Sequence, residues 1–162
     1  MSSESQEIEL KNLQSLLRDS INQELIVVEY ETCNLLPKGE NYASTMLKVE
    51  AKIRRTKNSP KENLPLVAKM IPTTEFQRDL FNATASFKKE IYVFEKLVPA
   101  YRMLEKEAGI SDENLFDILP KFYGGRLTLN KENSDKADED AVMLMENIKL
   151  HGYRIMDRKQ GE

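Results

Sequence analysis

An α+β domain is the fold class that the sequence predicts, from its length and from changes in the spacing of its apolar residues. The chain has 162 residues, of which 40% are hydrophobic and 31% charged, which suits one core with a solvated surface. Apolar residues recur every three to four positions in residues 7–23 and 84–107, and every second position in shorter segments. We therefore expect a five-stranded antiparallel sheet, one long helix between the third and fourth strands, and an extra N-terminal helix.

The N-terminal helix and the first strand are distinguished by this change of period. Apolar residues at helical spacing run from Leu10 to Ile21, within a helix predicted over residues 7–23. From residue 25 the spacing becomes two, which is typical of a half-buried strand. The face predicted to be buried carries Ile26, Val28, Tyr30 and Thr32.

A second and a third strand follow. The turn Pro37-Lys-Gly39 leads into a strand over residues 43–54, which we expect to pair with the first strand as an antiparallel hairpin. Residues 52–63 form a loop, and residues 64–71 form the third strand, ended by Pro72.

The long helix is predicted to begin at Thr84 or Ser86, either of which can serve as its N-cap, and to end near Glu107 with Gly109 as its stop. Because Pro99 lies inside this span, we expect a kink or a break there. The residues predicted to face inward are Ile91, Phe94, Leu97, Val98, Tyr101 and Leu104.

Two more strands complete the sheet. Residues 121–129 are predicted as the fourth strand, in which Gly124-Gly125 marks a bulge, and residues 141–145 as the fifth. The acidic stretch 130–140 between them lacks the glycine and the terminal glutamate of a calcium loop, so it is predicted as a solvated hairpin turn.

Lys69 and Glu90 are the strongest candidates for a functional pair. An ammonium at the end of the apolar run Leu66-Val-Ala is costly to desolvate unless it has a partner. Glu90, in the first turns of the following helix, is the best candidate for that partner. A strand lysine held by a helix glutamate is how protein kinases aim an ammonium at nucleotide phosphates. The alternative is a lysine that reaches solvent at the strand end and a glutamate in a surface charge cluster.

Charge and composition argue against several classes of partner. The net charge of -3 and the pI near 5.4 do not suit a nucleic-acid surface. No apolar run approaches membrane-spanning length, and the amino terminus lacks a signal peptide. Cys33 is the only cysteine, so no intrachain disulfide can form. We expect a cytoplasmic protein that binds neither nucleic acid nor membrane.

Five segments, in this order, resemble the insect ecdysteroid-kinase-like family, also called CHK-kinase-like, which is related to choline and aminoglycoside kinases. The segments are Gly39-Glu-Asn-Tyr-Ala-Ser44, Leu66-Val-Ala-Lys69, Phe87-Lys-Lys-Glu-Ile-Tyr-Val-Phe-Glu-Lys-Leu-Val-Pro99, Leu119-Pro-Lys-Phe-Tyr123 and Leu144-Met-Glu-Asn-Ile-Lys-Leu-His-Gly-Tyr-Arg-Ile-Met-Asp-Arg158. The resemblance implies the amino-terminal lobe of a kinase-like fold over residues 25–147, after a helical extension over residues 1–24. Residues 148–162 would be a linker toward a carboxy-terminal lobe that this sequence lacks.

The resemblance also implies an ATP site. Lys69 would hold the nucleotide phosphates, with Glu90 orienting its ammonium. The turn from Gly39 through Asn41 to Ser44 would cover the phosphates with backbone N–H groups and the Ser44 hydroxyl.

A hinge at residues 146–148 would hold the base. The Glu146 carbonyl and the Ile148 N–H would face the adenine edge, with Met145 beside the base. Asn147 stands where the family is expected to have an aspartate, which would change the hinge hydrogen bonds but not the phosphate site.

Phosphoryl transfer also requires carboxylates that position the acceptor hydroxyl and hold Mg²⁺. The resemblance implies that these come from the second lobe. His151-Gly152 is followed by Tyr153 rather than by the aspartate of a His-Gly-Asp catalytic loop, so no catalytic or metal-binding residue is assigned in this chain.

Two readings of the function remain open. In the first, the chain is a truncated piece of an ATP-dependent kinase that phosphorylates a small-molecule alcohol, with a steroid hydroxyl as one candidate, and that needs Mg²⁺ only when the second lobe is present. In the second, it is a non-catalytic nucleotide-binding or protein-interaction module, or a relic. A lone lobe would leave its inter-lobe face bare, which predicts self-association through that face.

Overall fold

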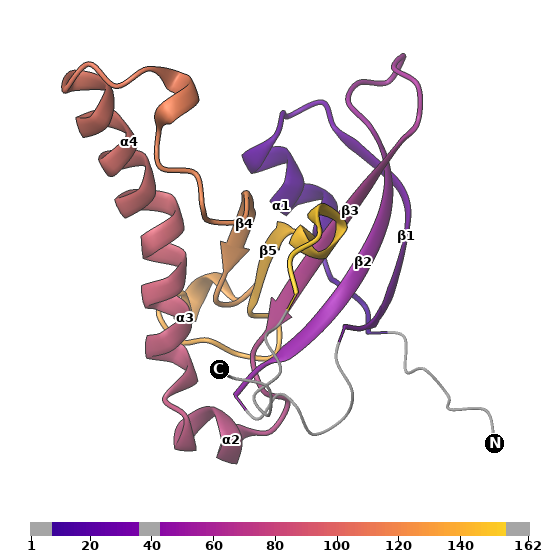
Figure 1. Cartoon of the computed structure of the whole chain (residues 1–162). Helices are drawn as coiled ribbons and strands as arrows, with labels where there is room; N and C mark the ends of the chain where they lie inside the picture. Colours follow the sequence, from indigo (N-terminus) through magenta and orange to yellow (C-terminus); the bar gives the residue numbers. More distant parts are fainter. Residues whose placement is uncertain (1–7, 36–42, 155–162) are drawn as a thin grey trace.

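Five antiparallel strands form one sheet with helices on both faces in the computed structural model (Figure 1). The structure describes residues 8–35 and 43–154. The strands are β1 (Ile26–Asn34), β2 (Thr45–Arg54), β3 (Glu62–Met70), β4 (Phe122–Arg126) and β5 (Val142–Glu146), and their order across the sheet is β1-β2-β3-β5-β4. The predicted α+β class and the five-stranded antiparallel sheet are confirmed.

The N-terminal helix α1 (Leu13–Ser20) packs against the larger core on one face of the sheet. That face carries the alternate apolar residues of β2, from Leu47 to Ile53, all of them buried. The helix is shorter than the predicted 7–23, because Asn12 adopts a left-handed backbone conformation with φ of 54° and interrupts it. Leu10 still reaches the core from the preceding turn.

A bulge in β1 corrects the predicted facing of that strand. Val27 pairs with Ile53 and Glu29 pairs with Lys52, so Val28 is an extra residue without a partner on β2. Val28 is consequently exposed rather than buried, and Val27 packs against the core in its place. Cys33, near the end of β1, is also exposed.

The helical part after β3 is longer and more continuous than expected. A short helix, α2 (Glu75–Leu80), precedes α3 (Ala83–Tyr92), a π-helical turn η1 (Val93–Leu97) and α4 (Val98–Glu107). Figure 1 shows α3 and α4 as one rod. The predicted caps are wrong, because α3 begins after Asn82, whose backbone is left-handed. None of the helices within residues 8–35 and 43–154 is long and apolar enough to cross a membrane.

Pro99 does not break this rod. The Val98 N–H donates to the Val93 carbonyl five residues earlier, which widens the turn just before the proline. Pro99, which has no N–H to donate to the preceding turn, directly follows this widened turn at the start of α4. The predicted irregularity is therefore present, but as a π-turn within a continuous helix.

The end of α4 follows the prediction, whereas its facing does not. Gly109 has φ of 83° and ends the helix with two bonds, from the Gly109 N–H to the Lys106 carbonyl and from the Ile110 N–H to the Glu105 carbonyl. Tyr101 and Leu104, predicted to face inward, are 55% and 56% exposed. The physical reason is that α4 extends past the sheet, so its apolar stripe has no strand to pack against (Figure 1).

The predicted bulge in β4 is present, directly before the glycine pair rather than within it. Phe122 pairs with Met145 and Gly124 pairs with Leu144, so Tyr123 is the extra residue. A Cβ on Gly125 would lie 2.9 Å from Ile91 Cγ1, which shows how closely α3 approaches this strand. The described residues also contain three 3₁₀ turns, η2 (Asp112–Asn114), η3 (Lys131–Asn133) within the predicted polar hairpin, and η4 (Ile148–His151) after β5.

Candidate nucleotide site

Lys69 on β3 and Glu90 on α3 lie in direct contact. The Lys69 ammonium is 2.6 Å from each of the two carboxylate oxygens of Glu90. The two side chains are 22% and 39% exposed, so the pair is half-buried and accessible from one side. Such a pair adds roughly 0–1 kcal/mol to stability, which makes orientation of the ammonium its more important effect.

Packing of α3 explains why these two residues meet. Phe87, one helical turn before Glu90, is fully buried in a second core on the side of the sheet opposite α1. Met143 of β5, the cross-strand partner of Lys69, belongs to the same core. The Lys69 ammonium lies 5.8 Å from the centre of the Phe87 ring, a cation–π distance. Burial of Phe87 therefore holds Glu90 over Lys69.

An apolar floor lies beside this pair on the same face of the sheet. Strand register places Val67 two residues before Lys69 and opposite Met145 of β5, while Met46 of β2 lies opposite Lys69. Residues two apart on a strand, and direct cross-strand partners, share a face. Met145, predicted to lie beside a nucleotide base, is thus on the Lys69 face.

The phosphate-covering turn is only partly visible. Gly39 and Asn41 lie outside the described residues. Ser44 precedes β2 directly and is partly exposed, two positions before the residue that pairs with Lys69. The strand pairing therefore brings the end of this turn to the Lys69 end of the floor.

The hinge residues follow β5 directly. The Glu146 carboxylate accepts the Lys121 N–H at 3.1 Å and lies 2.9 Å from His151 Nε2, while the Glu146 N–H donates to the Lys121 carbonyl. This side chain therefore ties the hinge to the start of β4. Ile148 opens the 3₁₀ turn η4, and the first N–H groups of a helix have no partner within it, which leaves the Ile148 N–H suited to an external acceptor.

Asn147 is buried at this hinge. It is 4% exposed, and within the described residues its side-chain oxygen is enclosed without a hydrogen-bond partner. An ionised aspartate in the same place would cost more to bury than the neutral amide. Asn147 therefore replaces the expected aspartate at a position where the surroundings disfavour a negative charge.

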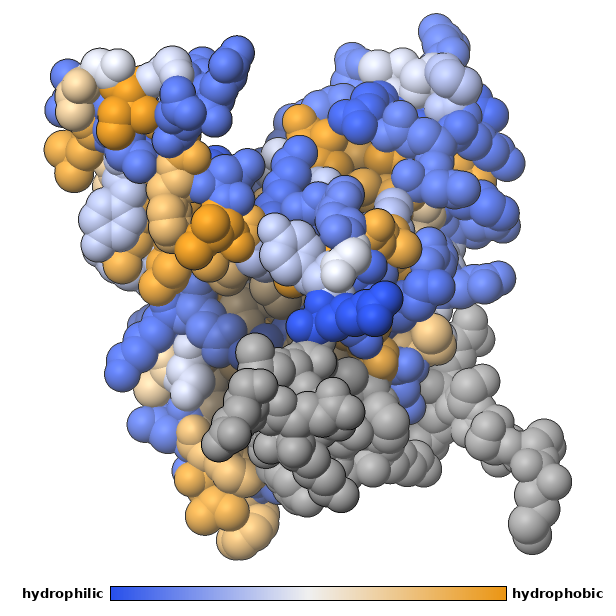
Figure 2. Space-filling model, viewed as in Figure 1, coloured by the Kyte–Doolittle hydropathy of each residue, from blue (hydrophilic) through white to orange (hydrophobic). Residues whose placement is uncertain are grey.

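A large open groove lies beside α4 in the described part of the chain. It has a volume of about 1110 Å³ and lies between α4, the loop that returns from it and the end of β5 (Figure 2). Its lining includes Phe94, Arg102 and Ile118, as well as Glu146 and Ile148 of the hinge, but neither Lys69 nor Glu90. Because the charged pair does not line the groove, we place the phosphate end of the candidate nucleotide site at the pair, and the groove meets that site only at the hinge. Within residues 8–35 and 43–154, no cluster of three or more metal-ligating side chains occurs.

Sequence reasoning did not identify Met46, Val67 and Met143 as part of this site. The alternation of β3 could have pointed to Val67, since it is two residues from Lys69. Met46 and Met143 depend on the register between strands, which apolar spacing alone does not determine.

The antiparallel sheet, with a lysine on its third strand joined to a glutamate on the next helix, is consistent with the amino-terminal lobe of a kinase-like fold. The model of the ecdysteroid kinase-like family matches residues 38–162, and the chain belongs to that family. Searches of curated proteins and of solved structures found no match.

Proposed function

We propose that this chain is the nucleotide-binding lobe of an ATP-dependent phosphotransferase that acts on a small-molecule alcohol. The observation that carries the proposal is the contact between Lys69 and both carboxylate oxygens of Glu90. Membership of the ecdysteroid kinase-like family supports the class of reaction. A steroid hydroxyl is the acceptor that the family description suggests.

In this proposal the residues of the chain bind and orient the nucleotide. Lys69 donates to phosphate oxygens, Glu90 holds the ammonium in place, and the turn ending at Ser44 covers the phosphates. The base lies near Met145, with the Glu146 carbonyl and the Ile148 N–H at its edge. Mg²⁺ and the group that positions the acceptor hydroxyl are assigned to a second lobe, so we expect nucleotide binding without turnover by these 162 residues alone.

Replacement of Lys69 tests the proposal. Lys69→Met keeps the length of the side chain and removes the charge, so we expect ATP affinity to fall about 10- to 100-fold, the loss typical of a hydrogen bond to a charged group. Titration of fluorescent ATP into the purified chain measures this. Lys89→Met on the exposed side of α3 is the matched control and should bind as the unaltered protein does. Equal affinity in the two variants would remove the site.

A second candidate is a non-catalytic interaction module. The observation that favours it is the open groove beside α4, which is lined by apolar residues such as Phe94, Val98 and Ile118. A partner held there would cover Glu146 and Ile148 of the hinge but would not contact Lys69 or Glu90. The absence of ATP binding, together with a stable complex formed through this groove, would favour this function over the first.

A further inference from the structure

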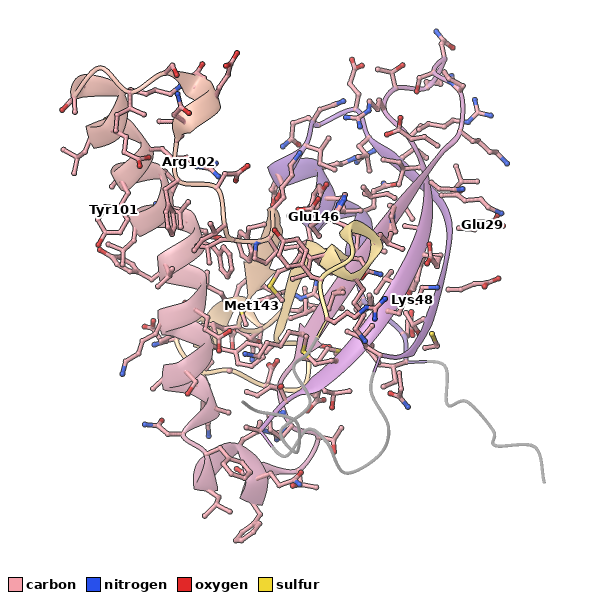
Figure 3. All side chains as sticks on the ribbon, viewed as in Figure 1. Glu29, Lys48, Tyr101, Arg102, Met143 and Glu146 are labelled. Carbon is pink, nitrogen blue, oxygen red and sulfur yellow. The ribbon has the colours of Figure 1, made fainter. Side chains whose placement is uncertain are left out.

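A second lysine lies on the face of the sheet that carries Lys69. Lys48 of β2 is the direct cross-strand partner of Val67, and Lys69 is the partner of Met46. Since Val67 and Lys69 share a face, Lys48 shares it as well. Diagonal neighbours of this kind have Cα atoms about 7–8 Å apart, so two flexible lysine side chains can reach one extended ligand between them. Figure 3 labels Lys48 on β2 and Met143 on β5, the strands that flank β3.

The present partner of Lys48 is easily exchanged. Its ammonium lies 2.7 Å from Glu50, two residues along the same strand, and the side chains are 41% and 44% exposed. The hydrogen bond to Glu50 raises the pKa of Lys48, so the group is fully protonated at neutral pH. Exposed ion pairs contribute little to stability, and the ammonium can therefore leave Glu50 for a ligand anion at little cost.

A second cation would add positive charge to a site where Glu90 already neutralises Lys69. Glu90 neutralises Lys69, so the pair as a whole presents almost no net positive charge. A triphosphate carries several negative charges, and further positive charge would strengthen its binding. Lys48 lies in the cross-strand row of Val67 and Met145, next to the row of Lys69, so its flexible side chain reaches the phosphates by extending along β2 toward the Lys69 row.

We propose that Lys48 is a second phosphate-binding cation, which swings from Glu50 to the phosphate chain of a bound nucleoside triphosphate. The proposal rests on the proposed function of Lys69. It predicts that Lys48 discriminates between nucleotides by the number of their phosphates, and that it contributes little to recognition of the base.

Binding of three probes to three variants tests this role. The probes are ATP, AMP and inorganic tripolyphosphate, titrated calorimetrically into the full chain. For Lys48→Met we expect about tenfold weaker binding of ATP and of tripolyphosphate, the size of one charged hydrogen bond, with AMP affinity changed less than about twofold. Lys52→Met is the matched control, because Lys52 lies further along the same face of β2 in a similar exposed pair, 2.5 Å from Glu29. It should leave all three affinities unchanged.

The outcomes separate this inference from the function on which it rests. If Lys69→Met loses ATP binding while Lys48→Met matches Lys52→Met, the role of Lys48 is overturned and the nucleotide site stands. An equal loss of AMP and ATP in Lys48→Met also overturns it, since the lysine would then act at the base or ribose. If Lys69→Met binds ATP as the unaltered chain does, the proposed function itself is rejected. Thermal melting of each variant confirms that it is folded.

Discussion

At the level of single residues, a lysine ammonium that donates to both oxygens of one carboxylate retains one N–H for another acceptor. Lys69 is in this state, held between Glu90 and the ring of Phe87. The remaining N–H has a direction that is set by the helix rather than by the flexible lysine itself. Preorganisation of this kind reduces the entropy that a ligand must remove on binding.

Because Glu90 orients the Lys69 ammonium, Glu90→Gln should weaken nucleotide binding. The amide keeps the shape of the side chain and removes the charge that fixes Lys69, so ATP should bind about three- to tenfold more weakly, a smaller loss than for Lys69→Met. The free energy of unfolding should change by less than about 1 kcal/mol, because the pair is partly exposed. Fluorescent ATP titration and urea denaturation measure the two quantities. Glu95→Gln, on the exposed side of η1, is the control. A loss of stability without a loss of affinity would make Glu90 a structural residue only.

The pairing of Lys69 with Glu90 could be predicted from sequence for a physical reason. A cation at the end of a buried strand needs a counter-charge, and the next helix offers one acidic residue at the start of its apolar stripe. Lys48 and Met143 could not be placed in the same way. Their relation to Lys69 depends on strand register, and no buried charge or turn in the sequence specifies that register.

Among the elements, α1 and α4 differ in how they use their apolar stripes. Leu17 of α1 is fully buried in the larger core, whereas Leu104 of α4 is mostly exposed. Leu17→Ala should therefore lower the free energy of unfolding by about 2–5 kcal/mol through lost burial and a cavity. Leu104→Ala, the same change on the other helix, should alter it by less than about 0.5 kcal/mol. Denaturant unfolding of both variants measures this difference, and similar losses would show that α4 is packed in solution.

The strands were predictable at this scale, and the long helix was only partly so. Alternation in β2 identifies its buried side chains, because a sheet with one face on a core has no other way to bury them. Helical spacing identifies a stripe on α4 without showing that anything lies against it, which is why Tyr101 and Leu104 were placed wrongly. The sequence also did not reveal that Val28 is an extra residue. The alternation of buried and exposed side chains resumes at Tyr30 after the bulge, so the apolar spacing looks regular.

The molecule as a whole has a body and a projecting arm. The arm consists of α4 and the loop that follows it, and its exposed apolar side chains include Tyr101, Leu104, Phe116 and Ile118. Figure 2 shows apolar surface on this arm across the groove from the sheet. Contiguous apolar surface of this kind is typical of faces that contact another domain or chain.

Self-association is accordingly expected at this arm. A double substitution, Tyr101→Glu with Leu104→Glu, should keep the chain monomeric at concentrations where the unaltered protein associates, because charge opposes burial of the apolar face. Sedimentation equilibrium over a wide concentration range measures the change. Phe76→Glu on α2, another exposed apolar position, is the control and should leave association unchanged. A monomeric Phe76→Glu variant with an associating double variant would place the contact on α2 instead.

The exposed thiol of Cys33 gives the molecule a practical property. Cys33 is the only cysteine of the chain and, on the edge strand β1, pairs directly with Lys48 of the neighbouring strand β2. A thiol-reactive dye would therefore attach at a single position, without any substitution, close to the surface where a nucleotide is expected to bind. Its emission would report a ligand's arrival in real time, so that weak and transient complexes could be followed in the native sequence.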